Sequence, residues 1–352
     1  MLVSVVIRTR NEADRLRLVL ASLSRQSVLL GTAAAPKSKD PVALEIVVVD
    51  DGSTDHTPEV LRAEAGCLPL RIVRLEPSRG RPEASNAGGR QAQGELLLFF
   101  DGDVLAAPDL VERHIRAHEG RTVLARGETF HLRCTRFFLN PETGSPRPGA
   151  EADVERMGAK RSENLVTRQQ LLHDFAAIEK RAQPGIYPGA GPRRLYEVEY
   201  EALHQHPELD VLWMAASGHN LSVRRSVFAE VGGFMGSLEH NDHRELALRL
   251  HRLGVPLVPV ANARSYHLTH QVGWRDPIGD SGWEQEFYRA HPCLAVKLMA
   301  IFWLSLTEDR GIPEHARIRS LMAFDAIVRH GTTVDYDAIR RALPRLGPLG
   351  EA

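Results

Sequence analysis

The sequence of 352 residues predicts an α/β fold built on a mostly parallel sheet. Short apolar runs rich in valine alternate, along the first 130 residues, with segments whose apolar residues recur at helical spacing. This alternation is typical of parallel sheets covered by helices on both faces. Polar clusters follow the predicted strands directly, which is where ligands bind in such sheets.

The first half of the chain has predicted strands and helices in strict alternation. The strands are Leu2–Ile7, Glu45–Val49, Leu70–Leu75, Leu96–Phe100 and Thr122–Thr129. The continuous apolar run of Leu2–Ile7 indicates burial on both faces, and Glu45–Val49 is expected to be a second buried strand. Helices are expected after Asn11, from Thr57, over Pro82–Gln93 and from Pro108. Asn11 and Thr57 are good N-cap residues, and Pro58 suits a first helical position. Residues 31–41, rich in Ala, Pro, Lys and Ser, are expected to form a loop.

The pattern loosens in the second half. We expect loops at 140–149 and 185–192, a strand at 211–215, and helices at 162–181, 223–231 and 245–253. The part from residue 283 is expected to be mainly helical and to fray after residue 342.

Composition excludes several classes of protein. Lys and Arg (44) balance Asp and Glu (45), so the chain lacks a net-basic coat for nucleic acid, and a local basic cleft stays open. Cys67, Cys134 and Cys293 are far apart, which argues against a disulfide framework and a zinc site. The apolar run Leu298–Leu306 is about half as long as a membrane span, so it predicts a core helix, with a surface-attached helix as the alternative. We expect a cytoplasmic protein with no membrane span.

Three polar clusters fall at the ends of predicted strands. Residues 8–12 (R-T-R-N-E) follow the first strand, Asp50 and Asp51 the second, and residues 101–103 (D-G-D) the fourth. Two carboxylates around a glycine can share a divalent cation, and hard oxygen ligands favour Mg²⁺ or Mn²⁺. Such a cation would neutralise a diphosphate leaving group, and Gly102 would let the backbone approach a phosphate. Asp51 is a candidate for contact with a base or ribose, and an Asx-turn is the alternative.

These clusters and three later motifs together resemble family 2 glycosyltransferases, which have the GT-A fold. The later motifs are S-N-A-G-G-R-Q-A-Q-G-E from residue 85, S-G-H-N-L-S-V-R-R-S-V-F-A-E-V-G-G-F from residue 217, and E-L-A-L-R-L-H-R-L-G from residue 245. The resemblance covers roughly residues 2–270. It implies a single Rossmann-like nucleotide-binding sheet with an acceptor-side lobe and C-terminal helices. It divides the chain into a nucleotide-sugar-binding half (1–130), an acceptor-binding and catalytic half (131–282) and a helical extension (283–352).

The resemblance also implies which residues bind the donor and the metal. Asp103 would be the more direct metal ligand, with Asp101 nearer the ribose and the metal-bound waters. His267 and His270 follow the last strand, where many relatives carry a histidine that completes the metal site; His267 is favoured, and a surface histidine is the alternative. The implied donor-binding residues are Arg8, Thr9, Arg10, Glu12, Asp51, Arg81, Asn86, Asp101, Gly102 and Asp103.

The catalytic base is expected near the start of the E-L-A-L-R-L motif. Relatives carry an acidic pair just before this motif, and one member takes the proton of the acceptor. Because Glu245 anchors the match, Asp242 and His243 stand where the pair belongs. Asp242 is the favoured base and Glu239 the second candidate, while capping of the following helix is the alternative role of Asp242.

Two positions depart from the family pattern. Arg10 stands where relatives often have an aromatic residue that stacks on the base; a guanidinium plane can stack as well, so UDP and GDP donors both stay open. Ser85 stands where an arginine is common, so Arg79 or Arg81 is expected to contact the diphosphate.

The sequence therefore predicts a metal-dependent inverting glycosyltransferase of hexosyltransferase type. It would move a sugar from a nucleoside-diphosphate sugar to a hydroxyl of a soluble sugar or small-molecule acceptor, and a homodimer is left open. One alternative is a non-catalytic sugar- or protein-binding scaffold, against which the retained acidic residues argue. A nucleotide-dependent oxidoreductase would need glycines after the first strand, where the sequence is R-T-R-N-E-A-D.

Overall fold

The computed structural model describes residues 1–32, 42–184, 195–270, 282–306, 311–343, 346 and 349. The chain divides into two compact units. The first comprises residues 1–185, 217–234 and 258–272, and the second comprises residues 186–216, 235–257 and 273–352.

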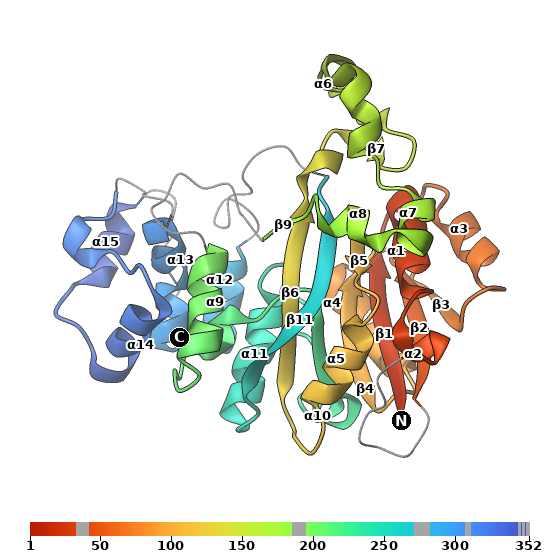
Figure 1. The fold of residues 1–352 in the computed structure, drawn as a ribbon. Coiled ribbons are helices and arrows are strands. Elements are labelled where there is room, and N and C mark those ends of the chain that lie inside the picture. The colour runs from red at the N-terminus through yellow and green to blue at the C-terminus, as the bar shows by residue number, and fades with distance from the viewer. Residues whose placement is uncertain are drawn as a thin grey trace. The chain divides into compact units, whose positions relative to one another are not determined.

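The first unit is built on a nine-stranded sheet (Figure 1). Its strands are β1 (Leu2–Thr9), β2 (Ala43–Asp50), β3 (Leu70–Arg74), β4 (Leu96–Asp101), β5 (Val104–Ala106), β6 (Leu124–Leu132), β9 (Gln183–Pro184), β10 (Leu221–Arg224) and β11 (Leu257–Leu268). The order is β3-β2-β1-β4-β10-β6-β11-β5, with β9 paired to β6. Strands β1 to β4 are parallel, β10 is antiparallel to both of its neighbours, and β5 is antiparallel to β11. The predicted α/β class is confirmed.

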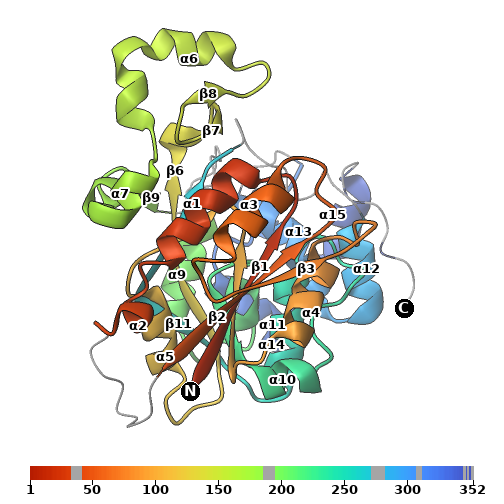
Figure 2. The ribbon, with the colours of Figure 1, turned by 90° about the vertical axis from the view of Figure 1, so that its right-hand side faces the viewer.

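Helices cover both faces of the parallel part of the sheet (Figure 2). Helix α1 (Ala13–Leu23) packs Leu16 and Leu20 on Val5 and Ile7 of β1. Alternate residues of the strands face α4 (Arg81–Gln91), because side chains alternate across a sheet. There a Cβ on Gly88 would lie 2.3 Å from Cγ1 of Val6, so the glycine lets α4 approach β1 closely.

The first unit also contains further helices and two short strands outside the main sheet. They are α2 (Ser27–Leu30), α3 (Thr57–Glu64), α5 (Leu110–Ala117), β7 (Phe138–Asn140), β8 (Ser145–Pro146), α6 (Glu151–Met157), α7 (Arg168–His173), α8 (Phe175–Glu179) and α10 (Arg225–Glu230). The expected helix over 162–181 was wrong as one element. A capping box between Thr167 and Gln170 starts α7, and Asp174, at φ −146°, separates it from α8. The helix expected over 223–231 starts at Arg225 because 221–224 pair as β10.

The second unit is helical where the structure describes it. It contains α9 (Leu195–Gln205), α11 (Asp242–Arg252), α12 (Trp283–Ala290), α13 (Leu294–Leu306), α14 (Leu321–His330) and α15 (Tyr336–Ala342). The strand expected over 211–215 was wrong: Leu212–Ala215 form a buried 3-10 turn, since a short apolar run fits either conformation. Residues 298–306 are buried in α13, which confirms the core helix.

Among the described residues, no helix has both the length and the apolar character that crossing a membrane requires. The expected loops at 31–41 and 185–192 lie almost entirely outside the described residues, as do most residues after 343.

Candidate active site

The register between β1 and β4 gathers the first polar residues of the site. Arg8 lies directly opposite Asp101, and its Nε donates to Oδ1 of Asp101 over 2.6 Å. The chain then turns at Gly102, whose amide donates to the carbonyl of Arg8. A Cβ on Gly102 would lie 2.6 Å from Oγ1 of Thr9. The glycine therefore has a packing role in this turn, because no larger residue fits against Thr9.

Asp103 faces two imidazoles that come from the far end of the sheet. Strand β11 pairs antiparallel with β5, and this register sets His267 opposite Val104. The amide of Leu268 donates to the carbonyl of Asp103 over 2.9 Å. Oδ2 of Asp103 consequently lies 3.3 Å from Nε2 of His267 and 2.9 Å from Nε2 of His270. The DGD turn and the two histidines form one cluster.

The electrostatics of this cluster favour an ionised carboxylate. Burial alone would raise the pKa of Asp103, but His267 and His270 hold it well below its usual range. Burial would likewise lower the pKa of His267, and the neighbouring Asp103 carboxylate reverses that effect and raises it. Glu12 lies near enough for burial and the charge of Asp103 to raise its pKa. Burial, aided by His267, lowers the pKa of His131 to about 3, so His131 is neutral.

The donor set fits a divalent cation. Asp103, His267 and His270 each offer one ligand atom, and these atoms lie within 4.8 Å of one another. Within the described ranges, Oδ1 of Asp103 and Nδ1 of His267 are buried and lack a hydrogen-bond partner. A buried carboxylate oxygen without a donor is costly, so it calls for a ligand or ion. Asp103 and His267 thus lie together as expected, joined by His270.

Asp101 is held by other partners. Besides Arg8, it faces Nδ1 of His219 at 3.4 Å, and Nε2 of His219 lies 3.2 Å from Oγ1 of Thr129. Burial alone would raise the pKa of Asp101, but Arg8 and His219 lower it. Sequence reasoning missed His219 as a site residue, although it stands inside the S-G-H-N motif.

A buried network fixes the backbone next to His219. Asn220 has a left-handed φ of 56°, and its Nδ2 donates to the carbonyl of Ala263 over 2.8 Å. Its Oδ1 lies 2.7 Å from Nε2 of His114, whose Nδ1 is 2.7 Å from Oγ of Ser222. These contacts tie α5, β10 and β11 together next to His219.

The polar atoms of two expected donor-binding residues form hydrogen bonds with backbone groups of this chain. Asp51 accepts from Oγ of Ser78 and from the amides of Arg79 and Gly80, at 2.7 to 3.0 Å. It therefore holds the loop that leads into α4. Asn86 exchanges two 2.8 Å hydrogen bonds with the backbone of Phe234. Their direct contact with a donor stays a prediction.

The exposed residues expected at this edge are arginines. Arg10 follows the end of β1 and is exposed, and Arg81 opens α4 and is exposed as well. Thr9 is buried, and within the described residues its Oγ1 has no hydrogen-bond partner. Cationic side chains at a sheet edge suit an anionic ligand.

The expected base lies in the second unit, at the start of α11. Asp242 is the first residue of this helix, is 4% exposed, and its Oδ1 lies 3.1 Å from Nδ1 of His243. Glu245 binds Arg249 through both oxygens at 2.6 Å, and its Oε1 also lies 2.8 Å from Nε2 of His291. Burial would raise the pKa of Glu245, but His291 and Arg249 lower it. These contacts suit an anchoring role for Glu245, whereas Glu239 is exposed.

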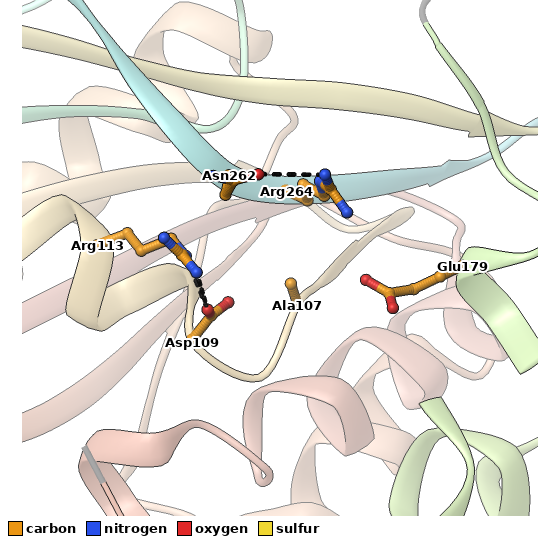
Figure 3. Close-up of a pocket in the computed structure, with 6 residues that line it drawn as sticks. All are labelled: Ala107, Asp109, Arg113, Glu179, Asn262 and Arg264. Carbon is orange, nitrogen blue, oxygen red and sulfur yellow. Dashed lines mark hydrogen bonds and ion pairs between the residues drawn. The ribbon is translucent and has the colours of Figure 1, made fainter. Parts of the chain in front are cut away.

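A separate hollow lies beside β5 and β11, with a volume of about 340 Å³ (Figure 3). Its lining residues are Ala107, Asp109, Arg113, Glu179, Asn262 and Arg264. Arg113 pairs with Asp109 at 2.6 Å, and Arg264 donates to Asn262. None of the expected site residues lines it.

Comparison with known proteins points to one family. Residues 4–166 match the model of glycosyl transferase family 2. The chain is 27% identical over 281 residues to the uncharacterized glycosyltransferase YfnE of Bacillus subtilis (strain 168), covering 76% of this chain and 64% of that protein. It is 28% identical over 315 residues to validoxylamine A glucosyltransferase of Streptomyces hygroscopicus subsp. jinggangensis (strain 5008), covering 88% and 65%. The chain thus spans just under two thirds of the length of these relatives.

Solved structures share the fold at low identity. Mannosyltransferase PcManGT from Pyrobaculum calidifontis, in complex with GDP-Man and Mn²⁺, has a TM-score of 0.50 at 19% identity, covering 98% of this chain and 72% of that one. GalNAc-T7 with UDP, GalNAc and Mn²⁺ has a TM-score of 0.52 at 18% identity, covering 93% and 57%. The chain therefore has the GT-A fold of these structures, and its residues 4–166 are similar to glycosyl transferase family 2.

Proposed function

We propose that the protein is a metal-dependent inverting glycosyltransferase that moves a sugar from a nucleoside-diphosphate sugar to a hydroxyl of a small acceptor. One observation carries this proposal. Asp103, whose buried Oδ1 has no hydrogen-bond partner among the described residues, faces two imidazoles at the carboxyl end of β4, inside the segment that matches the family. Ligands bind at this end of parallel strands.

The residues of the first unit would bind and orient the donor. Asp103 and His267 would hold the divalent cation, which would offset the negative charge of the diphosphate when bound. Arg8 and His219 keep Asp101 in place beside this site. The exposed Arg10 and Arg81 would contact the nucleotide, Arg10 by stacking on the base and Arg81 by pairing with a phosphate.

Asp242 would act as the general base. Its carboxylate would take the proton of the acceptor hydroxyl while the hydroxyl oxygen attacks the anomeric carbon. The bond from that carbon to the phosphate oxygen breaks, the nucleoside diphosphate leaves from the opposite face, and the anomeric configuration inverts. Support for Asp242 comes from its place at the start of α11, where the resemblance to the family expects the base, while both oxygens of Glu245 bind Arg249.

The acceptor is proposed to be a small hydroxyl-bearing molecule. Support comes from the relative named validoxylamine A glucosyltransferase, whose alignment extends over 88% of this chain. The test below compares UDP-sugars with GDP-sugars, so it identifies whether the donor base is uracil or guanine.

The test is donor turnover by the full chain. The protein is incubated with a set of UDP- and GDP-sugars and small polyols, with Mn²⁺, with Mg²⁺ or with EDTA, and release of nucleoside diphosphate is measured alongside product mass. We expect release from one class of donor, lost with EDTA and in Asp103→Asn. The matched control is Asp109→Asn, which lies outside the site and should retain activity. Release that persists in Asp103→Asn and EDTA would overturn metal dependence, and no turnover of any donor would favour the non-catalytic scaffold.

A further inference from the structure

We infer that the metal site of this chain consists of one carboxylate and two imidazoles, those of Asp103, His267 and His270, and that it selects a transition metal over Mg²⁺. This inference rests on the proposed function, because it concerns the cation that would accompany the donor. It goes further by assigning His270 as a ligand, by removing Asp101 from the ligand set, and by naming the class of cation.

Geometry supports a three-residue set. Nε2 of His267 and Nε2 of His270 both face one oxygen of Asp103, at 3.3 and 2.9 Å, and the three ligand atoms lie within 4.8 Å. All three side chains are partly shielded, with 13 to 26% of each exposed. A site that is shielded but open on one side can admit both a cation and the oxygens of a diphosphate.

Asp101 is engaged elsewhere. One of its oxygens accepts from Nε of Arg8 over 2.6 Å, and the other faces Nδ1 of His219 at 3.4 Å. Direct binding of a cation by Asp101 would compete with its ion pair to a guanidinium that is only 12% exposed. Its role is therefore to set the position of the turn that presents Asp103.

The surroundings of the imidazoles restrict their motion. The ring of His131 meets that of His267 edge-on, with centroids 5.1 Å apart, and the ring of His219 is stacked against His267 with centroids 6.4 Å apart. The backbone bond from Leu268 to Asp103 joins the two segments that carry the ligands. Rings held by packing and backbone bonds lose little entropy on binding a metal.

The chemistry of the donor atoms then decides which cation is preferred. Mg²⁺ strongly favours oxygen ligands and keeps its waters, whereas imidazole nitrogen suits first-row metals such as Fe²⁺, Ni²⁺ and Zn²⁺. A set with two nitrogens and one oxygen therefore penalises Mg²⁺. Affinity should rise from Mn²⁺ to Co²⁺, following the general order for first-row metals.

The experiment measures metal binding by the full chain without a sugar donor. Co²⁺ is titrated and followed by its visible absorption, and Mn²⁺ and Mg²⁺ are titrated by calorimetry. We expect Co²⁺ to bind more tightly than Mn²⁺, and both to bind at least ~10-fold more tightly than Mg²⁺. His270→Ala should weaken Co²⁺ binding by at least ~10-fold and change the absorption, while Asp101→Asn should cause the smaller loss. His173→Ala, an exposed histidine at the end of α7, is the matched control and should bind as the unaltered chain does.

Each contrary result is decisive. Equal affinities for Mg²⁺ and Mn²⁺, unchanged Co²⁺ binding in His270→Ala, or a larger loss in Asp101→Asn would overturn the inference. Circular dichroism melts verify that each variant is folded, and His270→Gln is the second variant if the alanine change unfolds the chain. A protein that binds Co²⁺ through His270 yet turns over no donor would refute the proposed function alone. One that turns over donor with metal affinity independent of His270 would refute this inference alone.

Discussion

Arg8 and Asp101 stand side by side on β1 and β4 and are joined by a 2.6 Å ion pair, so the first carboxylate of the DGD turn is neutralised by the strand next to it. The second carboxylate, Asp103, faces imidazoles instead. Two acidic residues separated by one glycine thus have different partners. The difference follows from strand pairing, because β1 lies against β4 whereas β11 lies against β5.

Removal of Arg8 should destabilise the fold. Asp101 is 27% exposed, so Arg8→Met would leave its charge partly buried without the guanidinium, at a cost of about 1–3 kcal/mol in the free energy of unfolding by urea. Arg62→Met is the control, since the Arg62–Glu59 pair is exposed and should contribute less than about 1 kcal/mol. The double variant Arg8→Met, Asp101→Asn should recover part of the loss. Equal losses in Arg8→Met and Arg62→Met would contradict this account.

The folded state should lose stability as the pH decreases from 6.5 towards 4, because His114 is buried. Burial lowers the pKa of His114 from 6.5 to about 4, so between these values the unfolded chain binds a proton that the folded chain does not. The contribution is complete above pH 6.5 and declines as the pH falls towards 4, by on the order of 3 kcal/mol at 1.36 kcal/mol per pKa unit. Chemical denaturation from pH 7.5 to 4 measures the slope.

The matched variant for this slope is His114→Gln. Its amide can still bond Ser222 or Asn220 but does not titrate, so the loss of stability between pH 6.5 and 4 should be smaller than in the unaltered chain. Burial lowers the pKa values of His118 and His131 to about 3. These two histidines should therefore still make the free energy of unfolding of the variant decrease as the pH decreases. Identical slopes in both proteins would show that His114 does not titrate as proposed.

Asp242→Asn should lower turnover by about 10²–10⁴-fold, the range that general base catalysis supplies. Donor affinity should be preserved, because the proposed role concerns the acceptor proton. Steady-state kinetics with a saturating donor gives the first quantity, and calorimetry with the nucleoside diphosphate gives the second. Glu239→Gln is the comparison: if it causes the larger loss while Asp242→Asn stays active, Glu239 is the base.

Arg10→Ala should weaken binding of the nucleoside diphosphate by about 1–2 kcal/mol, the scale of a stacking contact with a cation. Arg10 is exposed at the end of β1, where it is accessible to a base. Arg10→Tyr should restore most of the loss if stacking dominates, and little if hydrogen bonding to the base dominates. Titration with UDP and GDP measures both variants, and Arg17→Ala, an exposed arginine on α1, is the control. Unchanged affinity in Arg10→Ala would remove Arg10 from the site.

Local patterns were enough to predict the parallel half of the fold. Strands β1 to β4 and the helices between them are indicated by apolar runs and helical spacing within about ten residues. The polar clusters at the strand ends followed from the same patterns. The predicted N-caps Asn11 and Thr57 were wrong: Glu12 precedes α1 and His56 precedes α3, and neither forms a side-chain cap bond. Residues 212–215 show the limit, since an apolar run of this length is compatible with a strand or a turn of helix and only its packing decides.

The sequence by itself determined that Asp101, Gly102 and Asp103 follow a buried strand, and it singled out His267 and His270 as candidates. Only the tertiary structure decided that Asp103 faces both histidines and that Asp101 contacts Arg8 and His219. It also decided that Asp51 and Asn86 form hydrogen bonds with backbone groups. The physical reason is strand register. His267 is more than 160 residues from Asp103 along the chain. The two residues meet because β5 pairs with β11, and no local sequence pattern encodes this pairing.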